Sequence, residues 1–233
     1  MNLLRIKLFT IAGLVFLGEL LLTSCTSNKS PPASPLVLNV VARVSVAEVT
    51  LHTVIVPGGP NAWTKDALWD EYMVTITNRS SAPLTLESAT IEDVLHQPRR
   101  CGGDPLKLAR STVENWKEYR KGQVPVTKEG FETTVPAAVA IPLATAAIVM
   151  NPLNLILLPF ALADEESIKK EFANRQLVLP LILPSGSSAM GSIFFPMAAA
   201  PKNFALQGQC EGKPVEIVIP LTPLDQLHLT AAR

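Results

Sequence analysis

The chain is poor in the residues that carry most enzymatic and metal chemistry. It contains three histidines and three cysteines among 233 residues, and no histidine has another histidine or a cysteine at metal-ligand spacing. Phosphate loops, dinucleotide fingerprints and nucleophile elbows are missing as well. In the one elbow-like stretch, Met190 stands where a glycine is required. The sequence therefore predicts no metal, no cofactor and no catalytic residues.

Charge is also scarce and evenly balanced. The chain has 20 basic and 20 acidic residues, so its formal net charge is zero. Because no basic stripe is evident, we do not expect nucleic acid as a partner. Any attachment to a membrane is expected to depend on lipid instead of on polybasic attraction.

The first 25 residues have the parts of an export signal. Arg5 and Lys7 precede an apolar run, residues 8–17, which is too short to cross a hydrocarbon layer of about 30 Å. The motif Leu22-Thr23-Ser24-Cys25 follows. It resembles the lipobox of bacterial lipoproteins, in which the cysteine is acylated and becomes the first residue of the mature chain. Glu19 departs from the pattern, as a charge between the apolar run and the lipobox.

The resemblance implies an address at the cell envelope. Residues 1–24 are then a cleaved signal peptide, and Cys25 carries acyl chains, palmitate among them, that anchor the chain in a membrane. Thr26, in place of an aspartate, implies the periplasmic face of the outer membrane. Residues 25–35 comprise the lipidated cysteine and a flexible tether rich in proline and serine, and residues 36–233 form the folded domain.

Two cysteines remain in the predicted mature chain. Cys101 and Cys210 both lie in glycine-rich polar stretches typical of loops. In the oxidising periplasm, such a pair favours a disulfide between Cys101 and Cys210. Two unpaired thiols are the alternative.

Most of the predicted domain consists of short apolar or alternating runs separated by proline and glycine turns. Residues 72–77 and 84–94 flank a polar turn at 78–83, which predicts a β-hairpin and resembles the strand pairs of immunoglobulin-like sandwiches in exported bacterial proteins. Further strands are expected within residues 36–56, 177–183, 192–195, 204–208 and 215–221. The predicted fold is mainly β: an immunoglobulin-like antiparallel β-sandwich with an inserted helical segment at about 104–174.

Two amphipathic helices are expected inside that insertion. Residues 105–121 have apolar side chains at helical spacing, with Asp104 as the N-cap and Gly122 just beyond the end. A second helix follows Asp164 and extends to about residue 174, with Ile168 and Phe172 facing inward. The aromatic residues of the first helix are expected in the core.

Between these helices, residues 135–163 contain no charge but several prolines. We consider three interpretations: a buried helical hairpin that covers the sandwich, a hairpin that dips into the membrane or packs on a partner, and a true membrane span. Prolines at 142, 152 and 159 weigh against the span, because each one interrupts a helix.

The function that best fits these features is a lipid-anchored, non-enzymatic binding or structural module of the cell envelope, with an unknown protein or surface polymer as its partner. The alternative is a subunit of a membrane assembly that uses residues 135–163 to insert or to self-associate. A hydrolase is a third hypothesis. It would require His96 or His228 beside a serine or a carboxylate in a pocket.

Overall fold

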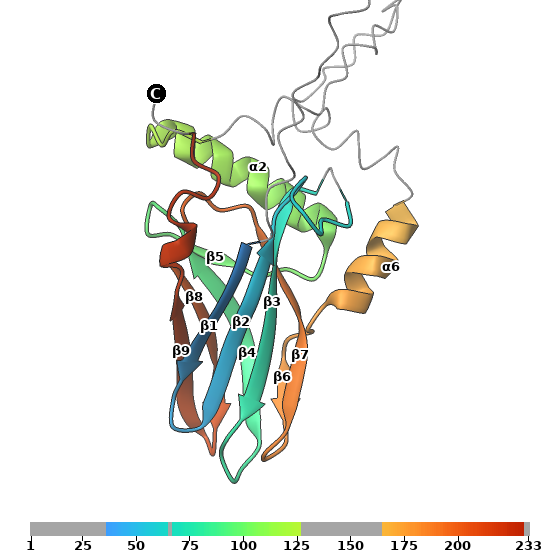
Figure 1. The fold of residues 1–233 in the computed structure, drawn as a ribbon, viewed down its shortest axis with the longest axis vertical. Coiled ribbons are helices and arrows are strands. Elements are labelled where there is room, and N and C mark those ends of the chain that lie inside the picture. Colours follow the sequence, from blue (N-terminus) through green and yellow to red (C-terminus); the bar gives the residue numbers. More distant parts are fainter. Residues whose placement is uncertain (1–35, 65–66, 127–164, 231–233) are drawn as a thin grey trace, which may run out of the picture. The chain divides into compact units, whose positions relative to one another are not determined.

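Two antiparallel sheets packed face to face make up most of the described part of the chain (Figure 1). The structure, a computed structural model, describes residues 36–64, 67–126 and 165–230. The predicted mainly-β class is confirmed, and the two packed sheets fit the predicted β-sandwich.

One sheet contains the first three strands and one late strand. Its order is β1-β2-β3-β7, and the strands span β1 Leu36–Arg43, β2 Ala47–Ile55, β3 Trp69–Asn78 and β7 Ser188–Pro196. We call it the front sheet, because it faces the viewer in Figure 1. β1 lies at one edge of this sheet, and Val37 and Val41 are exposed on it.

The second sheet lies behind the first and has the order β5-β4-β8-β9. Its strands span β4 Leu84–Glu92, β5 Pro98–Arg100, β8 Asn203–Cys210 and β9 Lys213–Pro220. The short strand β6, Leu181–Leu183, pairs with the first residues of β4, whereas β5 pairs with the last ones. A 3-10 helix, η1 Thr222–Leu224, follows β9.

Alternation along the strands builds the main core between the sheets. On β3, Tyr72, Val74 and Ile76 are fully buried while Met73 and Thr75 are only half-buried, as expected for a strand with one face on a core. Aromatic rings fill the centre, where Tyr72 stacks on Phe204 with ring centroids 6.0 Å apart. Burying this many apolar side chains is the main stabilising contribution to the fold.

The predicted hairpin of residues 72–94 is wrong. β3 pairs with β2 and β7, and β4 pairs with β5, β6 and β8, so the two strands belong to different sheets. Both strands have a fully buried face, with Ile76 on one and Leu84 on the other. The connection at 79–83 therefore crosses from sheet to sheet, since both apolar faces are then covered.

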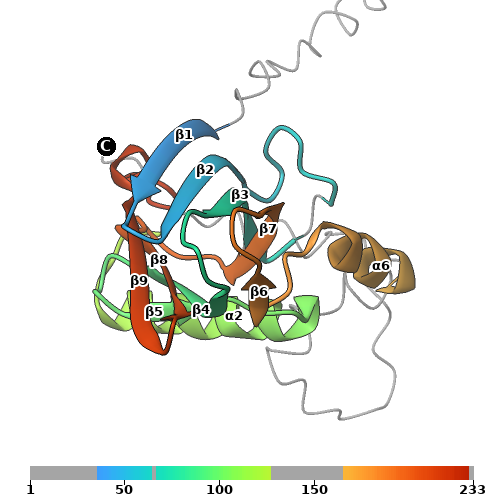
Figure 2. The same cartoon turned by 90° about the horizontal axis from the view of Figure 1, so that it is seen from below.

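Helix α2, Pro105–Lys121, closes one end of the sandwich, as Figures 1 and 2 show. Its predicted start is confirmed, because Asp104 Oδ1 accepts hydrogen bonds from the backbone N–H groups of Leu106 and Lys107. At the other end Gly122 is the C-cap with φ −78°, and Gln123 takes the left-handed conformation with φ 56°.

A second apolar cluster lies beneath α2 and the second helix, α6 Glu165–Arg175. Trp116 and Tyr119 of α2 and Phe172 of α6 are buried in it, as predicted. The Phe172 ring stacks on Phe194 of β7 with centroids 3.9 Å apart. Both predicted helices therefore form and direct their aromatic side chains into a core.

Several predictions concern residues outside the described part of the chain. These are the signal peptide 1–24, the lipidated Cys25, the tether and the uncharged segment 135–163. Within residues 36–64, 67–126 and 165–230, no helix has the length and apolar character needed to cross a membrane.

Candidate functional site

A cleft of about 480 Å³ lies at the end of the sandwich away from α2. Its size falls in the range of about 300–1,000 Å³ that is usual for small-molecule sites. Three connections between strands line it: the β1–β2 turn, the β3–β4 crossing and the β8–β9 hairpin. We call it the end cleft, and its lining residues are Val44, Ser45, Val46, Ser80, Ser81, Cys210, Glu211, Lys213, Pro214, Val215 and Glu216.

Hydrogen bonds hold the connections around the end cleft. The buried Asn78 amide donates to the backbone oxygens of Ala82 and Leu183, at 2.8 and 2.9 Å. Its Oδ1 atom accepts from the backbone N–H of Ser80 at 2.9 Å. Asn78 therefore joins the β3–β4 crossing to the end of β6 and fixes one wall of the cleft.

The β8–β9 hairpin forms the opposite wall with a two-residue turn. Cys210 pairs with Lys213, and the intervening Glu211 and Gly212 have φ values of 52° and 72°. Two successive positive φ values are typical of the type I′ turn that suits the twist of paired strands. This tight turn places Glu211 and Lys213, both exposed, at the rim of the cleft.

The chemistry of the end cleft is mixed. Serine hydroxyls and valine side chains share its wall, and one lysine lies near two glutamates. Beside it, Glu48 accepts hydrogen bonds from Arg43 at 2.6 Å and from Arg79 at 2.5 Å. The bond from Arg43 is the main reason that the pKa of Glu48 lies below its usual value. Such a site offers both polar and apolar contacts to a ligand and no concentrated charge.

Cys210 lines this cleft as a thiol, and the predicted disulfide with Cys101 is wrong for this structure. The Cys101 backbone N–H donates to the oxygen of Ala89, whereas Cys210 pairs with Leu84 on the same strand. Five residues along a strand separate these two positions by about 16 Å. A disulfide requires Cα atoms within about 7 Å, so the paired strands keep the two thiols apart.

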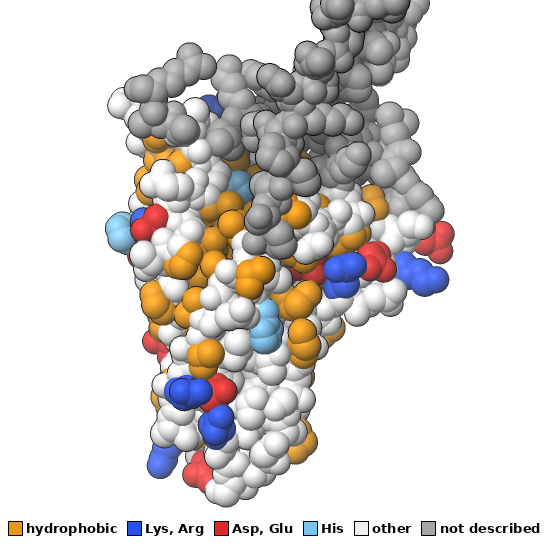
Figure 3. All heavy atoms as spheres, viewed as in Figure 1, with side chains coloured by type: hydrophobic (Ala, Val, Ile, Leu, Met, Phe, Trp, Pro, Cys, Tyr) orange, Lys and Arg blue, Asp and Glu red, His pale blue; other side chains and the backbone are white. Residues whose placement is uncertain are grey.

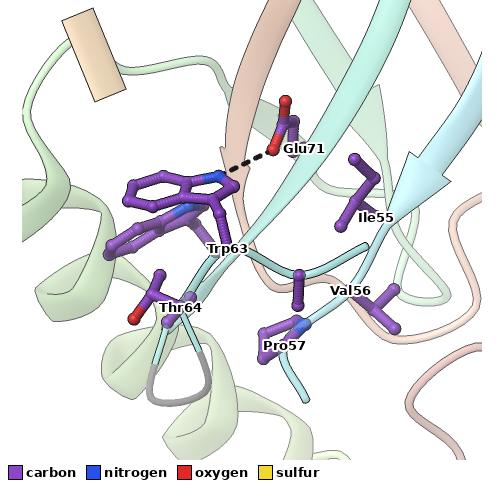
Figure 4. Close-up of a pocket in the computed structure, with 9 residues that line it drawn as sticks. Ile55, Val56, Pro57, Trp63, Thr64 and Glu71 are labelled. Atoms are coloured by element: carbon purple, nitrogen blue, oxygen red, sulfur yellow. Dashed lines mark hydrogen bonds between the residues drawn. The ribbon is translucent and has the colours of Figure 1, made fainter. Parts of the chain in front are cut away.

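A smaller pocket on the outer side of the front sheet surrounds Glu71 (Figure 4). Glu71 is 2% exposed, and its carboxylate accepts from Trp63 Nε1 at 2.9 Å and from Ser192 Oγ at 2.6 Å. The Arg175 guanidinium lies 3.6 Å from Glu71 and 5.7 Å from the centroid of the Trp63 ring. The remaining space is about 10 Å³, roughly one water molecule. Glu71 therefore fastens the loop before β3 and helix α6 to the sheet.

The neighbouring carboxylate, Asp70, faces the other side of β3 and is fully buried. His228 Nε2 lies 2.9 Å from both carboxylate oxygens of Asp70. The His228 side chain is itself 8% exposed. This contact ties the C-terminal segment to the start of β3, beneath α2.

The hydrolase hypothesis required His96 or His228 to lie beside a serine or a carboxylate in a pocket, and both histidines do contact a carboxylate. His228 contacts Asp70, and His96 contacts Glu92 on the surface, four residues earlier in the chain. His52 Nε2 lies 2.8 Å from Thr75 Oγ1. None of the three lines either of the pockets described above.

Metal-ligand sets were also sought across the described ranges. No group of three or more histidine, cysteine, aspartate or glutamate side chains in them is placed to hold a metal ion.

Asp93 is a buried carboxylate that sequence reasoning missed. Tyr119 Oη donates to it at 2.9 Å and Arg99 Nε at 2.7 Å, and the backbone N–H groups of Leu95 and Gln97 also donate. Burial raises the pKa of the Tyr119 hydroxyl well above its usual value. The cluster holds α2 on the β4–β5 connection. The pattern Asp-x-Leu-x-Gln before β5 was the one signal of an Asx-type turn.

Comparison with known proteins gives no match. No protein-family model, no curated protein and no solved structure matches this chain. The end cleft is the larger of the two pockets described here, and its lining mixes polar and apolar side chains.

Proposed function

We propose that the protein is a lipid-anchored, non-enzymatic binding module of the bacterial cell envelope, and that the end cleft is its binding site. The observation that carries this proposal is the cleft itself, about 480 Å³ in volume and lined by three strand connections. Connections held on a rigid sandwich are a common place for binding residues. The partner is a protein or a surface polymer able to use serine hydroxyls, mixed charge and short apolar side chains.

The direction of the chain supports this assignment. The chain enters β1 at Leu36, and β1 runs from the α2 end toward the end cleft. Eight strand residues span about 26 Å. A lipid on Cys25 would therefore hold the protein by the end that carries α2, and the end cleft would face away from the membrane toward a partner.

We also assign the sandwich to the immunoglobulin-like type. The strand neighbours support it: β3 lies beside β7 in one sheet, and β4, β8 and β9 are neighbours in the other. These correspond to the B–E pair and the C–F–G sheet of immunoglobulin domains. In this correspondence β2 is strand A, β1 is an additional edge strand, and the helical insertion between β5 and β7 stands where strand D would be.

Site-directed photo-crosslinking in living cells tests the binding assignment. A photoreactive residue replaces Ser81 or Glu211 at the end cleft, and Glu87, which is exposed on β4 and does not line the cleft, serves as the matched control. We expect the cleft positions to yield the same discrete crosslinked species and the control to yield none. Crosslinks of equal strength from all three positions, or none from the cleft, would contradict the assignment.

Assembly through residues 135–163 stays a prediction, because that segment lies outside the described residues. A chain from Thr26 onward, exported behind a cleavable non-lipidating signal, tests it. The binding-module proposal requires this chain to be a monomer in the soluble fraction after a carbonate wash. Retention in the membrane, or a defined oligomer, would favour the assembly instead.

A further inference from the structure

The exposed face of α2 carries a stripe of basic side chains. Lys107, Arg110, Lys117 and Lys121 are all exposed, and they recur with Glu114 at spacings of three and four residues, which places them along one side of a helix. The opposite side of α2 is buried in the second apolar cluster. The sequence was expected to contain no basic stripe. That expectation is wrong for α2, although the net charge of the whole chain is zero.

Few acidic groups offset the stripe within α2. Glu114 lies inside it, whereas Glu118 is held by Arg99 at 2.8 Å. We call the set Lys107, Arg110, Lys117 and Lys121 the basic stripe. A row of flexible, strongly hydrated ammonium and guanidinium groups on an exposed helix is suited to an anionic surface.

The basic stripe belongs to the end of the sandwich at which the chain enters. Leu36 pairs with Val54, and Val54 pairs with Tyr72, so two strand spacings of about 4.8 Å separate Leu36 from Tyr72. Four residues before Tyr72, the backbone oxygen of Leu68 accepts a hydrogen bond from Thr112 of α2 at 2.6 Å. The start of β1 and helix α2 therefore lie toward the same end of the sandwich (Figure 1).

If Cys25 carries the proposed lipid, the length of chain before β1 limits how far this end can lie from the membrane. Residues 26–35 separate the predicted lipidated cysteine from Leu36. A chain of ten residues reaches at most about 35 Å. With the proposed anchor inserted, the start of β1 therefore lies within about 35 Å of the membrane surface.

We infer that the basic stripe of α2 docks on anionic lipid headgroups of the membrane that holds Cys25. The inference rests on the proposed lipid anchor and adds a second, electrostatic contact to it. One lipid-modified residue leaves a domain free to rotate on its tether, whereas a second contact orients it. The docked domain lies with α2 on the membrane and directs the end cleft away from it.

Lysine footprinting on the full, lipidated protein tests this inference without altering the chain. The protein is reconstituted in vesicles of phosphatidylcholine alone or with 30% phosphatidylglycerol, treated briefly with an acetylating ester, and analysed by mass spectrometry. We expect the acetylation rates of Lys107, Lys117 and Lys121 to fall at least threefold in the anionic vesicles only. Salt at 0.5 M should restore them, because screening shortens the range of the attraction. Lys213, at the end cleft, is the internal control and should not change.

Charge reversal provides the matched variants. The pair Lys117→Glu and Lys121→Glu changes two exposed side chains and should abolish the protection of Lys107 in anionic vesicles. Lys213→Glu should leave that protection intact. Circular dichroism identifies any variant that has lost its fold, and the footprint of the unaltered protein decides the question in that case.

Three results would overturn the inference. These are unchanged rates in anionic vesicles, equal protection in both kinds of vesicle, and protection by an anionic polymer such as duplex DNA without protection by anionic vesicles. Failure of the lipid anchor gives a different result, since the protein would then not float with phosphatidylcholine vesicles at all. If the protein fails to float with neutral vesicles but its lysines are protected in anionic ones, the docking of the basic stripe is supported and the lipid anchor is contradicted.

Discussion

Tyr119 of α2 and Asp93 after β4 are joined by a buried hydrogen bond of 2.9 Å. The same hydroxyl accepts from the backbone N–H of Ala199 at 3.2 Å. One side chain of α2 thereby links two connections at the end of the sandwich. Because α2 carries the basic stripe, this bond helps to fix the surface that we place on the membrane.

Tyr119→Phe should destabilise the protein by about 2 kcal/mol, because the hydrogen bond that Tyr119 donates to the buried carboxyl group of Asp93 is lost. Tyr72→Phe is the matched control. The Tyr72 hydroxyl is buried and has no hydrogen-bond partner among the described residues, so its removal should be neutral or stabilising. Urea denaturation of both variants measures the difference, and equal losses would contradict the assignment of Tyr119.

Both cysteines of the domain should react as thiols. After denaturation without reductant, the chain should take up one alkyl group at Cys101 and one at Cys210, as mass spectrometry can show. The double variant Cys101→Ser, Cys210→Ser should lose less than about 2 kcal/mol, whereas a disulfide closing so long a loop would contribute about 4.7 kcal/mol. Labelling that appears only after reduction would show that Cys101 and Cys210 form the disulfide after all.

Stability should fall in alkaline solution. Burial raises the pKa of the Cys101 thiol and of the Tyr72 and Tyr119 hydroxyls. The unfolded chain therefore releases these protons first, and the contribution of each group is complete below its unfolded pKa and is lost as the pH rises above it. The free energy of unfolding should decline from about pH 9 upward. Urea titrations from pH 7 to 11 test this, and Tyr119→Phe should flatten the decline. A constant value would disagree with the burial of these groups.

Gly208→Ala should be among the most damaging substitutions in the domain. A Cβ atom there would lie 2.0 Å from the backbone oxygen of Thr85 and 2.8 Å from Leu86 Cα. Neither backbone atom can move without disturbing the pairing of β4 with β8, so we expect a loss of about 3 kcal/mol or more. Gly103→Ala is the control, because its Cβ would first meet the flexible amide of Gln176 at 3.1 Å. Thermal denaturation of both variants should separate them clearly, and similar melting temperatures would count against the described register.

Local patterns predicted the elements well. The helical spacing of residues 105–121 and the Asp104 cap predicted α2, and alternation predicted β3, β8 and β9 within a few residues. Residues 177–183 were expected as one strand, yet only Leu181–Leu183 pairs in a sheet. An apolar run alone does not show whether a partner strand lies within reach.

Pairing between elements was predicted less well. Residues 72–94 contain the signals of a hairpin, but the choice between pairing within a sheet and crossing to the next depends on which faces must be buried. Cys101 and Cys210 gave a similar false lead, because cysteine count carries no information about distance along β4. The basic stripe was present in the sequence at Lys107, Arg110, Lys117 and Lys121. It was overlooked because charges on a helix are usually only its solvated face.

The end cleft was beyond sequence reasoning for a related reason. Its wall combines Ser45, Ser81 and Lys213 from three connections that are distant in the chain. Only the pairing of β1 with β2 and of β8 with β9, together with the packing of the sheets, brings them to one end. No local motif marks such a site, since each connection alone resembles an ordinary polar turn.

The lipid on Cys25 is the central claim, because the direction of the end cleft and the docking of α2 both depend on it. The most direct test is mass spectrometry of the N-terminal tryptic peptide from the protein purified from bacterial membranes. Our account predicts a peptide of residues 25–29 whose cysteine carries a diacylglyceryl group and whose amine is acylated. A peptide that begins at Met1, or an unmodified Cys25, would contradict it.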